Sequence, residues 1–266
     1  MKIPQNVLDS FEVKEQPTQL SGGQGTNYKT GNIVLKPIEN IVEYEWIAES
    51  MNSIKQDGFR VPHYIKSING NWSEDGWIAY EFIEGEHIKN NWKEKFEVCE
   101  LFHKALEGFD CPEFIKEAND PWAIADRVVW EEQTVEHHPK LQEQLDKLKR
   151  LLKSIDLPNQ LIHGDITGNI LFHNNLSPAI IDFSPYYRPK DFDKAIIVVD
   201  ALVWEGADKT ILEFVKDISE INQLIIRAEM RRLIEIEECM KYFKKGDLND
   251  IEKHIATVDL ICNLYK

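Results

Sequence analysis

The sequence predicts an α+β fold of two lobes, a small β-rich lobe over residues 1–85 and a larger, mostly helical lobe over residues 86–266. Two observations carry this prediction. Short β-prone runs, separated by glycines and other turn residues, fill the first third of the chain. From His87 onward, apolar residues recur at helical spacing instead. A length of 266 residues is sufficient for two modest domains.

The first lobe is expected to be a small sheet with one inserted helix. Residues 40–54 carry Ile47, Met51 and Ile54 on one helical face. Runs of strand character lie on both sides of this segment. The expected strands are residues 18–20, 28–30, 33–37, 60–67 and 76–83.

The second lobe is expected to be helical around a few short strands. A β-rich part followed by a helical part suits a cleft between two lobes, which is a common place for a ligand site. Helices are expected at residues 93–106, 121–136 and 139–154 and over most of the chain after Pro189. Short strands are expected at residues 161–162, 170–172 and 179–183, flanking a polar loop.

The chain is acidic, with 31 Lys and Arg residues against 46 Asp and Glu residues and a formal charge of −15. This charge repels a phosphate backbone, so nucleic acid is not an expected partner. The most apolar stretch, residues 195–204, is too short to cross a membrane, and no leader peptide is visible. Four scattered cysteines without CxxC spacing favour a reduced, cytoplasmic protein. The oligomeric state is not indicated.

The densest polar cluster in an apolar setting lies in residues 161–172 and 179–183. Asp165, Asn169 and Asp182 follow or precede short apolar runs there, so strand ends would present them at one rim. One carboxylate can accept a proton or hold a hydroxyl in line for attack. An amide oxygen and a second carboxylate are hard ligands that suit Mg²⁺. Together these groups indicate phosphoryl transfer, in which positioning and charge neutralisation do most of the catalysis.

This cluster resembles the catalytic loop and metal-binding aspartate of the aminoglycoside phosphotransferase and choline kinase superfamily, whose members are relatives of protein kinases. Further motifs follow in the family's order and extend the resemblance over most of the chain. They are the glycine-rich loop at residues 22–28, the third-strand lysine at 34–36, the hinge at 79–85, the Leu-x-His helix at 101–103 and an aspartate motif at 193–195. The resemblance implies a two-lobed, protein-kinase-like fold.

The resemblance also implies a role for each matching residue. Asp165 would be the catalytic aspartate beside the acceptor hydroxyl, and Asn169 and Asp182 would hold Mg²⁺. Asp193 would support the catalytic loop without touching substrate.

On the nucleotide side, the resemblance implies that Lys36 pairs with the α and β phosphates of ATP. A helix glutamate would orient that lysine. Glu43 has the apolar neighbours at i+3 and i+4 that a lobe-facing residue needs, whereas Glu45 is the position that the resemblance suggests. Both stay open. The remaining ATP-binding positions are Gly23 and Gly25 in the phosphate loop and the backbone groups of Glu81 and Ile83 at the adenine.

The sequence departs from the family pattern at two places. Asp165 and Asn169 are four residues apart, one fewer than is common in the family, and Gly168 would supply backbone freedom for the shorter loop. Ser184-Pro185-Tyr186 follows Phe183, so no Asp-Phe-Gly is present, and no Ala-Pro-Glu occurs downstream. The lack of a peptide-docking segment favours a small-molecule acceptor.

The sequence therefore predicts an ATP- and Mg²⁺-dependent phosphotransferase that acts on a hydroxyl of a small molecule. Two alternatives stay open, an aminoglycoside-type antibiotic phosphotransferase and a catalytically silent nucleotide-binding protein.

We expect His163 to be a structural core histidine. The acidic stretches 131–136 and 235–238 are expected to be solvated helix faces, although they could attract a cationic acceptor. Core packing is expected of Trp122, Trp130 and Trp204, although tryptophans can also line an acceptor pocket.

Overall fold

The computed structural model describes residues 2–20 and 25–265. The chain separates into two compact units. The N-terminal unit comprises residues 1–87 and 169–183, and the C-terminal unit comprises residues 88–168 and 184–266. Residues 169–183 thus belong with the first 87, although they lie between two segments of the C-terminal unit in sequence. The predicted functional division into lobes over 1–85 and 86–266 stays a prediction.

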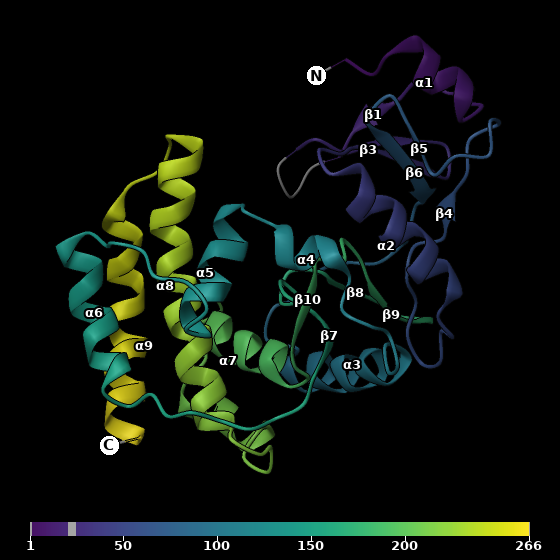
Figure 1. The fold of residues 1–266 in the computed structure, drawn as a ribbon. Helices are drawn as coiled ribbons and strands as arrows, with labels where there is room; N and C mark the ends of the chain where they lie inside the picture. Colours follow the sequence, from purple (N-terminus) through teal and green to yellow (C-terminus); the bar gives the residue numbers. More distant parts are fainter. Residues whose placement is uncertain (1, 21–24, 266) are drawn as a thin grey trace. The chain divides into compact units, whose positions relative to one another are not determined.

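An antiparallel sheet forms the centre of the N-terminal unit, with strand order β1-β2-β3-β6-β4 and β5 paired to β6 (Figure 1). The expected strands at 28–30 and 33–37 are confirmed, whereas the run at 60–67 gives only a two-residue strand because Pro62 cannot donate to a ladder. The strands are β1 (Thr18–Gln19), β2 (Tyr28–Thr30), β3 (Ile33–Pro37), β4 (Tyr64–Ile65), β5 (Ser73–Glu74) and β6 (Trp77–Glu81).

Two helices accompany this sheet. The expected helix is α2 (Ile41–Ser53), and the side chain of Asn40 caps it by accepting a hydrogen bond from the backbone N–H of Glu43. Helix α1 (Gln5–Ser10) was not expected from the sequence because it is too short for a helical period to be visible. Its apolar residues pack with those of β3 and β6. The buried members of this cluster are Ile3, Val7, Phe11, Leu35, Trp77 and Ala79.

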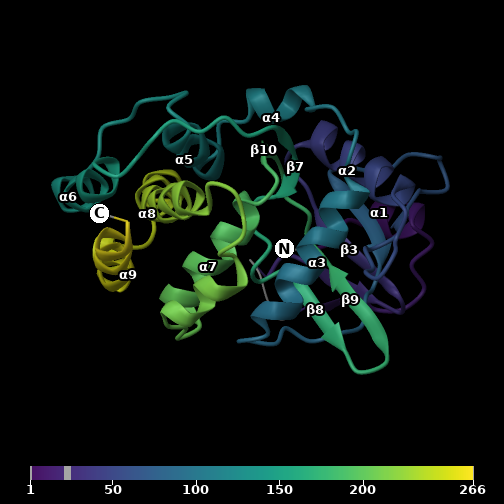
Figure 2. The same ribbon diagram turned by 90° about the horizontal axis from the view of Figure 1, so that it is seen from below.

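The hairpin of β8 (Ile170–His173) and β9 (Leu176–Ile180) completes the N-terminal unit (Figure 2). Backbone hydrogen bonds join it to two places in the first 87 residues. Arg60 exchanges bonds with Pro178 and Ile180, and Glu86 exchanges bonds of 2.8 and 2.9 Å with Phe172. Gly85 permits the second contact, since a Cβ there would lie 2.8 Å from that of Leu171. These bonds explain why the hairpin belongs to the N-terminal unit.

Helix α8 (Ile221–Phe243) is the central helix of the C-terminal unit and packs against α5, α6, α7 and α9 (Figures 1 and 2). The long helical region expected after Pro189 is broken near Gly206 and Gly246, where the backbone has positive φ angles of 74° and 92°. The other α-helices are α3 (Trp92–Ala105), α4 (Glu113–Glu117), α5 (Pro121–Val129), α6 (Pro139–Lys149), α7 (Phe192–Trp204) and α9 (Ile251–Leu264), with 3₁₀ turns at Lys209–Phe214 and Leu248–Asp250. Within the described residues, no helix is long and apolar enough to cross a membrane.

Strands β7 (Asn159–His163) and β10 (Pro185–Pro189) pair antiparallel in this unit, directly before Gly164 and directly after Ser184. The backbone N–H of Gly164 donates to the carbonyl of Ser184 at 2.8 Å. The ring of Tyr186 lies against Gly164, and the Arg231 guanidinium lies 4.4 Å from the centre of that ring. Arg231 also donates to the Gly164 carbonyl at 2.9 Å. The glycine is required because a Cβ at residue 164 would come within 2.0 Å of the tyrosine ring.

The Leu-x-His and Asp193 motifs, which are far apart in sequence, meet in the core of the C-terminal unit. The Nε2 atom of His103 lies 2.7 Å from a carboxylate oxygen of Asp193, and both side chains are buried. The side chain of Gln160 on β7 donates to the His103 carbonyl at 3.3 Å. Asp193 therefore connects α7 to α3 in the core. His103 in turn connects α3 to β7 through its carbonyl.

We predict that Gly164→Ala destabilises the protein, because the added methyl collides with the buried ring of Tyr186. Overpacking of this kind costs about 1–3 kcal/mol in the free energy of unfolding. Gly168→Ala is the matched control, since a methyl there meets nothing within 4 Å and the backbone φ is not positive. Urea unfolding followed by circular dichroism would compare the two variants, and equal midpoints would contradict the prediction.

We also predict a pH-dependent contribution from Glu100 on α3. Its carboxylate accepts hydrogen bonds from Lys194 at 2.5 Å and Lys190 at 3.1 Å. The bond from Lys194 lowers the pKa of Glu100 from 4.5 to about 2, against the opposing effect of burial. A lowered pKa means that the stabilisation is fully present above pH 4.5 and is lost as the pH falls towards 2.

Glu100→Gln should therefore lower the unfolding midpoint at pH 7, and the difference from the unmodified protein should shrink below pH 4.5. Because 54% of the Glu100 side chain is exposed, we expect an effect on the scale of a surface pair, below about 1 kcal/mol. Urea midpoints measured from pH 7 to pH 3 test this. Glu143→Gln, which removes only an exposed pair with Lys147, is the control. A difference that stays constant over the whole range would contradict the assignment.

Candidate active site

Lys36 and Asp182, 146 residues apart in sequence, form an ion pair in the N-terminal unit. Lys36 lies on β3, and only 13% of its side chain is exposed. Burial lowers the pKa of Lys36, but Asp182, Tyr44 and Tyr80 together outweigh burial, so the pKa lies above its ordinary value. The side chain of Asp182 is about half exposed. Two residues predicted to handle the phosphates and the metal are thus brought together.

Tyr44, a residue of α2 that was not predicted for the site, lies beside Lys36. The lysine Nζ lies 4.8 Å from the centre of the Tyr44 ring. Glu45 instead accepts a hydrogen bond from Ser73 Oγ at 2.7 Å. Successive residues of a helix are rotated by about 100°, so Glu43 and Glu45 lie to either side of the tyrosine. Which glutamate, if either, orients Lys36 stays a prediction, and no motif in the sequence singles out Tyr44.

The predicted phosphate loop joins β1 to β2, and Gly23 lies outside the described residues. Gly25 has a φ of +65°, a left-handed conformation that favours glycine. Its carbonyl accepts a hydrogen bond from the side chain of Gln19.

The predicted adenine-binding positions lie at the end of β6. The backbone N–H of Glu81 donates to the His63 carbonyl at 2.8 Å, and Ile83 follows the strand as a half-buried residue.

Asn169 and Asp182 flank the open end of the β8–β9 hairpin. Ile170 pairs with Ile180, and the backbone N–H of Ile181 donates to the Asn169 carbonyl at 2.9 Å. Asp182 has a φ of +50°, a left-handed conformation that is uncommon for residues other than glycine. Such strain is frequent at functional sites. Gly168 has no positive φ, so the backbone freedom expected of it is not used.

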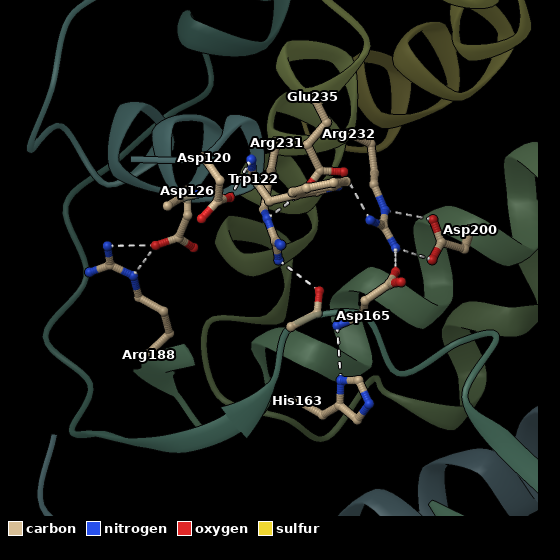
Figure 3. Close-up of polar contacts among 12 residues, drawn as sticks. Asp120, Trp122, Asp126, His163, Asp165, Arg188, Asp200, Arg231, Arg232 and Glu235 are labelled. Atoms are coloured by element: carbon tan, nitrogen blue, oxygen red, sulfur yellow. Dashed lines mark hydrogen bonds and ion pairs between the residues drawn. The ribbon is translucent and has the colours of Figure 1, made fainter. Parts of the chain in front are cut away.

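Asp165 is the centre of a polar network in the C-terminal unit (Figure 3). Its backbone N–H donates to Nδ1 of the buried His163 at 3.1 Å. The ring of His163 therefore supports the backbone of this loop, which agrees with the expected structural role. The Asp165 carboxylate accepts a hydrogen bond of 2.9 Å from Arg232, and 58% of the side chain is exposed. Burial raises the pKa of Asp165, but the positive charge and hydrogen bond of Arg232 outweigh it and hold the pKa below its ordinary value.

Three carboxylates surround the Arg232 guanidinium. Asp200 on α7 accepts bonds of 2.9 Å from Nε and 2.6 Å from Nη2, and Glu235 accepts a bond of 2.9 Å from Nη1. The third carboxylate is Asp165. Asp200 also accepts a hydrogen bond of 2.7 Å from the hydroxyl of Thr167. Sequence reasoning missed Arg232 and Asp200, because each lies in a helical segment far from the recognised motifs.

A pocket of about 430 Å³ in the C-terminal unit adjoins this network. Its lining is acidic and partly aromatic. The lining carboxylates are those of Asp165, Asp200, Glu205 and Glu235, and the lining tryptophans are Trp122 and Trp204.

Two sequence-based expectations need correction here. Trp122 and Trp204 were expected to pack in the core but line the pocket, whereas Trp130 packs against Phe192 with ring centres 5.2 Å apart, as expected. Glu235 was expected on a solvated face, but it is buried and paired with arginines because its helix is surrounded by others. Helical periodicity alone could not indicate that α8 is covered on most sides.

Solved structures similar to this chain share its fold. A spectinomycin phosphotransferase, APH(9)-Ia, solved with ADP and spectinomycin, aligns with a TM-score of 0.63 and 15% sequence identity, covering 97% of this chain and 96% of that chain. An aminoglycoside phosphotransferase from Alicyclobacillus acidocaldarius aligns with a TM-score of 0.63 and 13% identity, covering 100% and 94%. These likenesses confirm the predicted two-lobed, protein-kinase-like α+β fold.

A thermostable mutant of the aminoglycoside phosphotransferase APH(4)-Ia, solved with AMP-PNP and hygromycin B, aligns with a TM-score of 0.59 and 14% identity, covering 97% of each chain. No curated protein sequence matches this chain. The model of the phosphotransferase enzyme family does match it, over residues 28–187. That span is more than half of the chain and runs from β2 to β10, so the protein belongs to the phosphotransferase enzyme family.

Proposed function

We propose that the protein is an ATP- and Mg²⁺-dependent phosphotransferase that acts on a hydroxyl group of a small molecule, with Asp165 as the catalytic aspartate. The observation that carries this proposal is the carboxylate of Asp165. It is more than half exposed, lines an acidic pocket and is kept ionised by Arg232. A carboxylate in this state can accept the proton of an acceptor hydroxyl.

The nucleotide side of the proposal is supported by the pairing of Lys36 with Asp182. Lys36 is suited to binding ATP phosphates, and the half-exposed Asp182 carboxylate and the Asn169 amide oxygen are ligands that fit Mg²⁺. When bound, Mg²⁺ neutralises the charge of the phosphates. Similar structures were solved with ADP, with AMP and with AMP-PNP, which agrees with a nucleotide site. Glu81 and Ile83 remain the candidates at the adenine, and Gly23 and Gly25 those in the phosphate loop.

The reaction follows from these assignments. The acceptor hydroxyl oxygen forms a new bond to the γ-phosphorus of ATP, and the bond between that phosphorus and the β–γ bridging oxygen breaks. ADP leaves with the electron pair of that bond, and the hydroxyl proton passes to Asp165. Lys36 stabilises the negative charge of the phosphates, while Asp165 orients the hydroxyl for in-line attack.

The lining of the pocket favours a cationic acceptor. Four carboxylates and one arginine line it, so the charge of these groups is negative, and two tryptophans, a residue type that can bind ammonium groups, lie beside them. Similar structures contain spectinomycin, gentamicin and hygromycin B. An aminoglycoside-type antibiotic is therefore the second candidate acceptor, within the wider class of cationic hydroxylated molecules. A silent nucleotide-binding protein is disfavoured, because Lys36, Asp165 and Asp182 are all present.

A phosphate-transfer screen tests the proposed function directly. The purified protein would be incubated with ATP, Mg²⁺ and a panel of cationic and neutral hydroxylated metabolites and antibiotics, and phosphorylated products would be detected by mass spectrometry. We expect transfer to at least one cationic member. Calorimetry with AMP-PNP should show binding that needs Mg²⁺ for full strength. If neither ATP nor GTP binds at millimolar concentration, the proposal is wrong.

The proposed roles of the two aspartates predict different consequences for their loss. Asp165→Ala should lower turnover by about 10²–10⁴ while ATP affinity changes little, since this group acts on the acceptor. Asp182→Ala should lower turnover and also weaken binding of the Mg²⁺–ATP complex. Steady-state kinetics and calorimetry on both variants would separate the two roles.

The control for this comparison is Glu213→Gln, which removes an exposed carboxylate that pairs with Lys216 at 3.1 Å. It should leave turnover and nucleotide affinity unchanged. Near-normal turnover in Asp165→Ala would refute the assignment of the catalytic loop. Unchanged Mg²⁺–ATP affinity in Asp182→Ala would refute the metal role alone.

A further inference from the structure

Arg232 has no place in the motifs that identify the family, yet it contacts the carboxylate proposed to be catalytic. It lies on α8, 67 residues after Asp165. Its guanidinium is largely buried, with 13% of the side chain exposed, whereas Asp165 is 58% exposed. Both side chains line the pocket, but the arginine is the more buried end of this pair and the aspartate the more exposed one.

The arginine is fixed because its three guanidinium nitrogens all donate to carboxylates. Nε and Nη2 bind the two oxygens of Asp200, and Nη1 binds Glu235. Two-point binding of a planar guanidinium by a carboxylate sets its plane as well as its position. Nη2, which Asp200 also holds, donates to Asp165. The direction of that last bond is thus set by α7 and α8 and not by the loop.

The loop around Asp165 is bound to the same helices at two further points. Thr167 donates its hydroxyl hydrogen to Asp200 at 2.7 Å, and the Gly164 carbonyl accepts a bond of 2.9 Å from Arg231. Asp165 lies between these two attachments in sequence. The backbone is therefore held on both sides of the aspartate. Figure 3 shows the contact of Arg232 with the Asp165 side chain.

We propose that Arg232 is a positioning residue, which fixes the direction of the Asp165 carboxylate in the pocket and supplies its counter-charge. This inference rests on the proposed catalytic role of Asp165. Arg232 is poorly suited to binding an anionic acceptor, because its three nitrogens already donate to Asp165, Asp200 and Glu235. A purely structural role is the competing explanation, since buried charges that lose their partners destabilise the fold.

The test uses a double-mutant cycle on the full chain. Arg232→Met removes the charge and keeps the bulk of the side chain, and Asp165→Asn removes the charge of the proposed catalytic group. If Arg232 acts through Asp165, Arg232→Met lowers kcat about tenfold to a hundredfold when Asp165 is present. In the Asp165→Asn background it lowers the residual kcat less than twofold, because the group it positions is already disabled. The KM for ATP changes less than twofold in either case.

Two further variants complete the design. Arg232→Lys keeps the charge but loses the planar fork, so it should recover part of the lost kcat. Arg188→Met is the matched control, because Arg188 is also clamped by two carboxylates, Asp126 at 2.7 Å and Glu132 at 2.6 Å, but does not line the pocket. It should lower the unfolding midpoint and leave kcat unchanged. The acceptor is the molecule found in the phosphate-transfer screen.

A loss of kcat by the same factor in both backgrounds, or no loss with Asp165 present, would overturn the inference in favour of a structural role. Crystal structures of the unmodified protein and of Arg232→Met provide a readout that needs no acceptor. We expect the Asp165 carboxylate to leave its position in the variant, and an unmoved carboxylate would also overturn the inference. If the unmodified protein phosphorylates nothing, the proposed function fails. The comparison of the two crystal structures still decides whether Arg232 positions Asp165. If Arg232→Met does not fold, Arg232→Lys takes its place in the cycle and in the crystals.

Discussion

The geometry of the loop that contains Asp165 depends on charges buried along one helix. Helix α8 carries Arg231 and Arg232 into the interior of the C-terminal unit, where an unpaired guanidinium would be costly. Each arginine is paired with a carboxylate of its own helix and also bonds the loop that contains Asp165. The need to pair these buried cations therefore fixes the loop. Arg232 and its carboxylate partners also line the pocket, which makes the pocket polar.

The sequence was sufficient to predict the fold class and the short motifs, because both are local properties. Alternation of β-prone runs and turn residues indicated β2 and β3 with their observed bounds. The residues proposed for chemistry lie in a few compact motifs, and Asp182 and Lys36 could be found by their neighbours in sequence alone. Their ion pair in the structure agrees with that prediction, although their roles toward ATP and Mg²⁺ remain proposals.

The residues that support the motifs could not be predicted, because their positions depend on packing between distant segments. Tyr44 lies beside Lys36 because of the rotation of α2, which the motifs do not indicate. Trp122 and Trp204 lie at a pocket whose walls come from several helices, so no helical period could distinguish them from core residues. The short helix α1 is specified by the apolar surface that it covers and not by any pattern of its own.

Each unit pairs one proposed functional carboxylate with one cation, but the two pairs are built differently. Lys36 and Asp182 form a direct pair in which the aspartate is half exposed. The pair can therefore separate, so that Lys36 contacts phosphates and Asp182 contacts a metal ion. Arg232 is clamped by Asp200 and Glu235 in addition to Asp165, so an arriving ligand would have to break several bonds to displace it. The first pair is thus suited to opening when substrate binds, whereas the second is suited to staying in place through each turnover. This difference matches the proposed roles, a nucleotide site that must fill and empty and a catalytic aspartate whose direction must not change.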